Sequence, residues 1–329
     1  NVLMGKDAGG AINTAGNNIA IGANAGDALT SGNSNVAIGP NAIGVATDVD
    51  LAVVIGNHAG GGGNMTSDAD GTVIIGAYAG DALTSGRYNV AVGYEALSAE
   101  DDGDFNTAVG HQALTSQTGI SGTVANTALG YHAGENVTSG RYSTFVGAFS
   151  GDEHQTGNHV TAVGYSSLSA QNGDKTGTTA IGAQALHQNV SAATTDYSVA
   201  VGAEAGTNQT TGYQNTFLGG NTTGNGTGAV NQIVIGYAAA GHGDNIAVIG
   251  NTSMTAWHPA DDNGVDLGSA SYRFANLYTA DVQLSNEGTE GNEVDGTTGN
   301  WTIQEGEDDL YLLNRKNGKK YRFKLEEIK

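Results

Sequence analysis

The stretch "NVAVGYEALSAEDDGDFNTAVGHQAL", residues 89–114, contains nearly the same phrase twice. Asn89 opens the first copy and Asn106 opens the second, 17 residues later. In each copy branched residues flank an alanine and a glycine follows, which is the period-two pattern of a short strand. A strand of this length cannot bury its own face, so the pattern predicts that the copies stack on one another.

The same phrase recurs along most of the chain. Fifteen copies align on an aliphatic residue followed by glycine, and we call this glycine the anchor glycine of its copy. Most intervals are 17 residues, and longer ones contain polar insertions such as 60–70 and 117–122, which predict loops on one side of the stack. We therefore expect an all-β parallel β-roll or β-solenoid of about fifteen 17-residue rungs. The anchors are Gly5, Gly22, Gly39, Gly56, Gly76, Gly93, Gly110, Gly130, Gly147, Gly164, Gly182, Gly202, Gly219, Gly236 and Gly250.

The two faces of each short strand differ in side-chain size. Val, Ile or Thr stands three residues before nearly every anchor, and Ile, Val, Leu or Met stands one residue before it. We expect these side chains to line the core. The residue between them is usually alanine, although Phe145 and Phe217 replace it in two copies. An alanine stripe on the opposite face favours self-association, and a homotrimer would hide the stripes at a central axis, although pattern alone does not choose three chains over two.

Small and polar residues at fixed positions give further expectations. The third residue after each anchor is always Ala, Ser or Thr, which predicts a second short strand. The anchor glycine itself predicts a tight turn with positive φ. Asparagine at the start of a copy fits two interpretations, a stacked amide ladder or a residue that merely begins turns well. The seven asparagines are Asn1, Asn18, Asn35, Asn89, Asn106, Asn126 and Asn215.

Charge is unevenly distributed along the 329 residues, whose net charge is -21. Residues 315–329 hold seven basic and two acidic side chains and carry +5, which leaves -26 on residues 1–314. An acidic surface repels phosphate backbones and anionic lipid, so we expect no nucleic-acid or membrane-surface binding along most of the length. No apolar run approaches the roughly 20 residues that a membrane helix needs, so we expect no membrane insertion. The absence of cysteine excludes disulfides and thiolate metal sites. Residue 1 already lies inside a copy, so we expect the chain to be part of a longer protein.

The phrases "NIAIGANAGDAL" (18–29), "NVAVGYEAL" (89–97) and "NTALGYHAG" (126–134) resemble the head repeats of trimeric autotransporter adhesins and the longer repeats of bacteriophage tail fibres. The resemblance covers residues 1–253 and implies a left-handed parallel β-roll of three chains. "DLGSASYRFANLYTADVQLSN" (266–286) is similar to a segment near the end of many phage fibre proteins. Residues 254–329 show neither the heptads nor the membrane-barrel pattern of an autotransporter, which favours the phage fibre.

We expect residues 254–329 to form a small β-rich tip or connector. Its end, "DLYLLNRKNGKKYRFKLEEIK", predicts a hairpin over 310–325 with a two-residue type I′ turn at Asn317 and Gly318. Tyr321, Phe323 and Leu325 alternate with basic residues, so one face of the second strand is expected to be apolar.

Candidate chemistry is sparse. The segments "TSDADGT" (66–72), "SAEDDGDF" (98–105) and "ADDNGVD" (260–266) resemble parts of calcium loops, but none has the full pattern, so no cofactor is expected and calcium is the alternative. We expect no enzyme activity, although a polysaccharide-cleaving carboxylate pair stays open because only separation in space decides it. His111 and His132 directly follow the strand phrase and are expected to be exposed.

These patterns predict an extracellular structural protein, namely a virion tail fibre or adhesin that binds a host-surface glycan or outer-membrane protein. Trp257, Tyr272, Trp301 and Tyr311 are the candidate receptor-binding residues, and each fits a trimer core equally well. The expected partners are sister subunits, the receptor, and other fibre or baseplate proteins. The alternative is a bacterial trimeric surface adhesin or an extracellular filament that self-assembles end to end.

Overall fold

The computed structural model describes residues 1–329 except 119–120, 170–175, 189–195, 261–264, 288–290 and 325–329. The chain divides into two compact units, Asn1–Thr255 and Ala256–Lys329. The first unit is a β-solenoid and the second is a small antiparallel sheet. Each is described by itself below.

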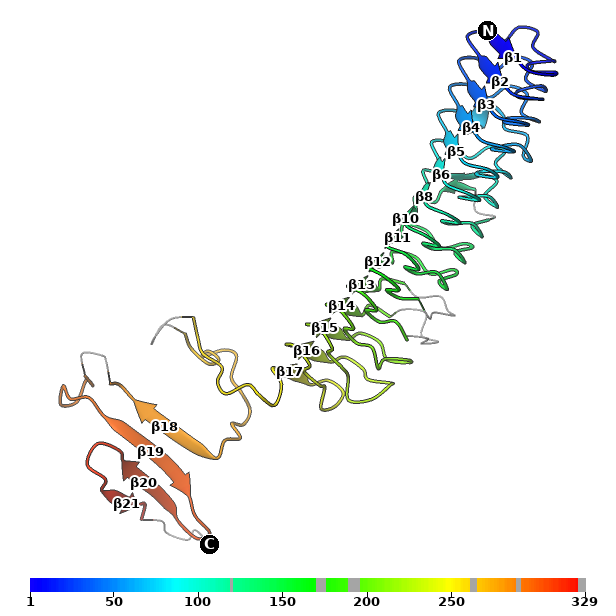
Figure 1. The fold of residues 1–329 in the computed structure, drawn as a ribbon. Helices are drawn as coiled ribbons and strands as arrows, with labels where there is room; N and C mark the ends of the chain where they lie inside the picture. Colours follow the sequence, from blue (N-terminus) through cyan, green and yellow to red (C-terminus); the bar gives the residue numbers. More distant parts are fainter. Residues whose placement is uncertain (119–120, 170–175, 189–195, 261–264, 288–290, 325–329) are drawn as a thin grey trace. The chain divides into compact units, whose positions relative to one another are not determined.

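The solenoid is a stack of short parallel strands, as the repeat predicts (Figure 1). Each strand pairs with its neighbour so that equivalent residues meet, for example Ala91 with Ala108. Where two anchors are 20 residues apart, as at Gly56 and Gly76, the register is unchanged. Ile55 pairs with Ile75, and the extra residues lie in the loop. The strands are β1 (Val2–Met4), β2 (Ile19–Ile21), β3 (Val36–Ile38), β4 (Val53–Ile55), β5 (Val73–Ile75), β6 (Val90–Val92), β8 (Thr107–Val109), β10 (Thr127–Leu129), β11 (Thr144–Val146), β12 (Thr161–Val163), β13 (Thr179–Ile181), β14 (Val199–Val201), β15 (Thr216–Leu218), β16 (Ile233–Ile235) and β17 (Ala247–Ile249).

Two small elements lie in the loops of the solenoid. The two-residue strands β7 (Gly103–Asp104) and β9 (Gly122–Thr123) pair with each other in parallel. A short 3-10 helix, η1, spans Ser67–Ala69. The helix η1 and the strand β9 lie in rungs that carry insertions, so the extra residues are accommodated without disturbing the main sheet.

The anchor glycines adopt the backbone conformation that the sequence predicts. All fifteen have positive φ, from 89° at Gly250 to 148° at Gly130. A Cβ on Gly93 would lie 2.6 Å from the carbonyl carbon of Gly110 in the next rung. Glycine is therefore required both for the turn and for the close approach of successive rungs.

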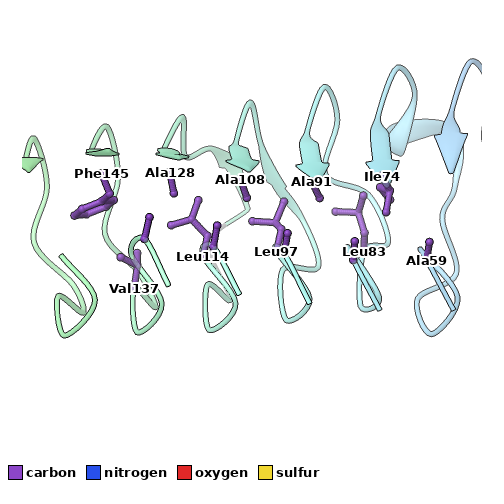
Figure 2. Close-up of a cluster of buried hydrophobic side chains, with 14 of the residues drawn as sticks. Ala59, Ile74, Leu83, Ala91, Leu97, Ala108, Leu114, Ala128, Val137 and Phe145 are labelled. Carbon is purple, nitrogen blue, oxygen red and sulfur yellow. The ribbon is translucent and has the colours of Figure 1, made fainter. Parts of the chain in front are cut away.

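The prediction that branched side chains line the core was wrong. In most rungs the middle residue of the strand is fully buried, whereas the two branched residues beside it are half-buried or exposed. Figure 2 shows Ala91, Ala108 and Phe145 pointing from the strands into the interior, toward Leu97 and Leu114 from the opposite loops. The interior of a rung receives one such loop side chain, so the strand position facing it is usually alanine and the bulkier pair lies outside.

A second strand after the anchor is also absent from the described rungs, where turns occupy that position. The second and fourth residues after the anchor repeatedly adopt left-handed φ, including the non-glycine residues Gln112 (54°) and Leu114 (51°). A left-handed backbone cannot continue a strand. The small third residue is buried in most rungs, as expected of a crowded turn, and at Ser150 the hydroxyl donates to the anchor carbonyl of Gly147 at 2.9 Å.

The asparagines at the start of the copies connect rungs, but they do so by bonding to backbone rather than to one another. Asn18 Oδ1 accepts a hydrogen bond from the backbone N–H of Asn35 at 2.8 Å, and its Nδ2 donates to Gly32 O at 2.8 Å. The same pair of bonds recurs at Asn35, Asn89, Asn126 and Asn215, all of them buried. Each amide thus satisfies one donor of the next rung and one acceptor of a loop.

Phe145→Ala is expected to lower the free energy of unfolding by about 3–5 kcal/mol, because it opens a cavity in a packed interior. Phe145 is fully buried, and a Cβ on Gly134 would lie 3.0 Å from its ring. Urea unfolding measures the loss. Phe105→Ala is the matched control, because Phe105 is 46% exposed and only stacks on Tyr88, so a loss of about 1 kcal/mol or less is expected. Equal losses for the two variants would contradict the assigned interior.

The C-terminal unit contains one antiparallel sheet in the order β18 (Asp281–Ser285), β19 (Asn300–Glu305), β20 (Leu310–Asn314) and β21 (Lys320–Arg322). The predicted hairpin is present, but its two-residue turn was wrong. Leu312 pairs with Tyr321, so residues 315–318 form a four-residue loop in which only Gly318 has positive φ. Asn314 Oδ1 accepts hydrogen bonds from Lys316 N at 2.9 Å and Asn317 N at 3.1 Å, which closes the longer loop. Leu325 lies outside the described residues.

Candidate functional site

The largest candidate surface is the outer side of the solenoid sheet. We call the branched side chains one and three residues before the anchors the outer face. Leu129 is 50% exposed and Leu218 is 48% exposed, and Ile233 and Ile249 are nearly as accessible. The face continues along β1 to β17, because the sheet is in register throughout. The outer face is only partly apolar, because threonine stands three residues before six of the anchors, and its partly exposed branched side chains make it a candidate interaction surface.

An aromatic ladder follows the anchors, one or two residues after them. The ring centroids of Tyr94 and His111 are 5.1 Å apart, those of His111 and Tyr131 are 5.2 Å apart, and both pairs are stacked within 27°. The ladder consists of His58, Tyr78, Tyr94, His111, Tyr131, His132, Phe149 and Tyr165. Several rings stack on one another's faces, so the ladder stabilises neighbouring rungs.

The two histidines predicted to be exposed differ in environment. His111 is exposed, as expected, but His132 is partly buried and its Nδ1 contacts Glu135 Oε2. The ladder was not predicted, although the sequence carries its signal: aromatic residues and histidines recur one or two residues after the anchors in seven successive rungs.

A column of acidic side chains lies five residues after the anchors, where Glu135 and Asp152 occupy equivalent positions in successive rungs. Asp152 Oδ1 is buried and has no hydrogen-bond partner among the described residues. Burial, together with the nearby carboxylates of Glu153 and Glu135, raises the pKa of Asp152 from its ordinary 3.8 to about 6. The ionised form of Asp152 is therefore disfavoured in the folded chain.

Asp152→Asn is expected to be more stable than the wild type above pH 6, by up to about 1 kcal/mol once solvent screening of this half-buried group is allowed for. Because the folded state holds the proton more tightly, the wild type loses stability as pH rises from about 4 to 6, and the neutral amide does not. The difference in unfolding free energy between the two proteins should rise over that window and vanish near pH 3.5. Asp68→Asn, at an exposed carboxylate, is the control. A difference that stays constant with pH would contradict the assignment.

In one of the three calcium-like segments, residues 98–105, three carboxylates lie close together. Ligand oxygens of Glu100, Asp101 and Asp102 lie within 4.8 Å of one another. Glu100 is fully buried, and its Oε1 accepts a hydrogen bond from Gly103 N at 2.7 Å while its Oε2 accepts one from Gln117 Nε2 at 2.6 Å. Amide donors therefore already satisfy this carboxylate. In the other two segments, Asp70 accepts a bond from Asp50 N at 2.7 Å, and Asp261 and Asp262 lie outside the described residues. Calcium binding stays a prediction.

The four candidate receptor-binding residues do not form one site. Trp257 is 73% exposed and Tyr272 is 84% exposed, both in irregular backbone before β18. Trp301 lies on β19 and Tyr311 lies on β20, where Tyr311 pairs with Gln304. Residues 301 and 304 are three apart on one strand, so Trp301 and Tyr311 are on opposite faces of the sheet.

Each of these two aromatics lines a pocket of its own. The Trp301 pocket has a volume of about 460 Å³, and the Tyr311 pocket, which Gln304, Leu313 and Lys320 also line, has about 280 Å³. Residues of β18, the loop that follows it and Trp301 on β19 line the Trp301 pocket. The sequence did not predict this pocket, because only the strand register brings these residues together.

Two findings complete the description. Within the residues that the structure describes, no helix is long and apolar enough to cross a membrane. No protein-family model matches the chain, and no curated protein matches it in sequence.

Proposed function

We propose that this chain is a structural fibre or adhesin protein of a virion tail, which displays and binds a receptor on the host-cell surface. The observation that carries the proposal is the outer face, a row of partly exposed branched side chains along a fifteen-stranded solenoid. The resemblance of its repeats to autotransporter heads and phage tail fibres supports the same assignment.

The outer face favours a homotrimer as the working form. Leucine and isoleucine side chains on this face are up to half exposed in one chain, and their burial would contribute roughly 25 cal/mol per Å². Three identical faces closing around one axis would cover the row along its whole length. The prediction that subunits meet through the alanine stripe was wrong, because the strand alanines are buried within each chain. The proposed contact between subunits is therefore through the outer face.

The backbone of the solenoid suits a load-carrying rod. Anchor N–H groups donate to strand carbonyls of the preceding rung, as in Gly93 N to Ile75 O at 2.7 Å and Gly110 N to Val92 O at 2.8 Å. Such hydrogen bonds run along the stack, together with the asparagine bonds described above. Pulling on the ends therefore loads many bonds in series, each supported by packing in the interior.

Competition for adsorption tests the receptor-binding part of the proposal. Host cells preincubated with the pure full chain should adsorb phage carrying this protein more slowly, and the effect should saturate with protein concentration. An adsorption rate that is unchanged at saturating protein would contradict receptor binding.

The second candidate function is a filament whose subunits join end to end. It is favoured by the charge distribution, since residues 1–314 carry -26 and residues 315–329 carry +5. Attraction between such regions is screened by salt. Filaments that lengthen with protein concentration and dissolve in high salt, seen by electron microscopy, would favour this candidate, and particles of one fixed mass would favour the fibre.

A further inference from the structure

A second row of rings runs along the solenoid, at the starts of the strands. Its members stand five residues before their anchors, whereas the aromatic ladder stands one or two residues after them. Tyr88 stacks on Phe105 with ring centroids 5.6 Å apart, and Tyr142 stacks on His159 at 5.3 Å. We call these four residues the strand-start row.

The strand-start row and the ladder border the two long sides of the outer face between β6 and β12 (Figure 1). In the rung of Gly93, Tyr88 precedes β6 and Tyr94 follows it, and the two side chains are 56% and 43% exposed. Each of the four rungs that hold a ring of the strand-start row also holds a ladder ring. The surface open to a partner is therefore the outer face together with both rows.

The strand-start row is interrupted once, at Ala125. This residue stands five residues before Gly130, in the position between Phe105 and Tyr142. It shares the left-handed backbone of its neighbours in the row, with φ 53° against 64° and 57°. A methyl group at this position leaves a gap in a row that otherwise carries rings from Tyr88 to His159.

The ladder has an additional ring in the same rung, because Tyr131 and His132 both follow Gly130. His132 is held inside the ladder, where it stacks on His111 at 5.3 Å and on Phe149 at 5.6 Å. Tyr131 is 47% exposed. One rung thus has a gap at the start of its strand and a projecting ring at the end of its strand.

The size and the period of this surface indicate a second copy as the partner. Fifteen strands spaced about 4.8 Å apart extend over roughly 70 Å, and the seven residues from one row to the other span roughly 20 Å. The resulting area, up to roughly 1,400 Å² per chain, exceeds the about 800 Å² that each partner contributes to a standard complex. A partner has to repeat at the same spacing to stay in register along this length, and a sister solenoid does.

Symmetry decides which rows meet. When three parallel solenoids turn their outer faces toward one axis, each corner joins the strand starts of one chain to the strand ends of the next. Ala125 and Tyr131 belong to one rung and therefore lie at nearly the same height along the axis. We propose that Tyr131 of each chain fills the gap at Ala125 of the next chain, and that the strand-start row packs against the neighbouring ladder on either side of this contact. The inference rests on the proposed fibre, because it names the side chains through which its subunits meet.

Crosslinking of the full chain, which contains no native cysteine, tests the contact. Ala125→Cys/Tyr131→Cys, treated with a short bismaleimide, should give a product of three chains on a denaturing gel. Each single variant should stay uncrosslinked, because equivalent residues lie at different corners. Ala125→Cys/Ser139→Cys is the matched control, since Ser139 is exposed in the loop of the same rung, and it should give no three-chain product.

A second pair of variants tests the gap without removing the projecting ring. Ala125→Tyr should leave the circular dichroism of the rungs unchanged, because aromatic residues already occupy the equivalent positions 105 and 142. It should raise the concentration at which the trimer dissociates about tenfold or more, since a ring in the gap overpacks the contact. Ala125→Tyr/Tyr131→Ala, which moves the ring from one side of the contact to the other, should restore much of the loss.

The contact would be overturned if the double-cysteine variant gave no more three-chain product than the control, or if Ala125→Tyr assembled as tightly as the wild type. Crosslinking of the single variants would also overturn it, because like rows would then face one another. In these cases a native mass of three chains would leave the proposed trimer standing. A wild type that stays monomeric would instead contradict the trimer itself.

Discussion

Gly93→Ala is expected to lower the free energy of unfolding by about 3–5 kcal/mol, which makes it one of the two most damaging single substitutions in the solenoid. Gly93 has φ 139°, a region that side-chain-bearing residues rarely adopt, and an added Cβ would lie 2.6 Å from the carbonyl carbon of Gly110 and closer still to its oxygen. The rung cannot retreat from this clash, because hydrogen bonds tie it to the neighbouring rungs on both sides. The backbone strain of alanine at this φ and the overlap of its Cβ with Gly110 therefore both contribute to the loss of stability.

Urea unfolding followed by circular dichroism measures the Gly93→Ala loss, and hydrogen exchange shows whether it is centred on β6 and β8. Gly226→Ala is the matched control, because a Cβ there would meet nothing within 4 Å and its φ is not left-handed. The control should change stability by less than about 1 kcal/mol. A Gly93 variant as stable as the control would contradict the close stacking of the anchor glycines.

Asn126→Ala is expected to cost a similar amount, about 3–5 kcal/mol, for a different reason. Asn126 is fully buried; its Oδ1 accepts from Ser143 N at 2.9 Å, and its Nδ2 donates to Gly140 O at 2.6 Å and to Gln117 Oε1 at 2.9 Å. Alanine would leave one donor and two acceptors buried without partners, each costing about 1–3 kcal/mol unless water enters.

A graded series tests this explanation. Asn126→Ser should lose less than Asn126→Ala, because a serine at the equivalent position elsewhere, Ser143, accepts from Val160 N at 3.2 Å through its hydroxyl. Asn231→Ala is the matched control, since its amide lies at the surface and bonds only to Asn245. Stabilities in the order Asn231→Ala, Asn126→Ser, Asn126→Ala, from highest to lowest, are expected from the same unfolding curves. Equal losses for the two alanine variants would show that the buried bonds contribute nothing.

The repeat predicts the solenoid because its period and its glycines carry physical requirements that few other folds meet. A strand pattern only five residues long, repeated in phase, has to bury itself against its own copies, and a glycine at every turn allows them to approach. The period also survives the insertions at 60–70, because these lie in a loop and leave the register of β4 and β5 intact.

The sequence pattern separates the two faces of the strand but does not decide which is inside. Larger side chains were assigned to the core on the ordinary expectation that they gain more from burial. Two signals point the other way. Threonine, as at Thr107 and Thr144, occurs only in the outer pair, and the middle position is never polar. Where Phe145 replaces alanine, glycines stand at 134 and 151, and a Cβ on either would overlap its ring or nearly touch it.

The rest of the candidate site depends on tertiary relations that composition does not encode. The hairpin turn was misjudged because the Asn314 side chain, outside the expected two-residue turn, bonds to the loop and sets its length. The Trp301 pocket exists because the β18–β19 register brings Leu284 opposite Trp301. The aromatic ladder is the exception, since the sequence shows aromatic residues and histidines one or two residues after successive anchors.

Native mass measured by light scattering tests whether sister subunits cover the outer face. We expect a particle of three times the 33.1 kDa chain mass, which Leu129→Arg, a charge on the outer face, should dissociate without unfolding the rungs. A wild-type chain that stays monomeric at micromolar concentration, with its leucines and isoleucines facing water, would contradict it.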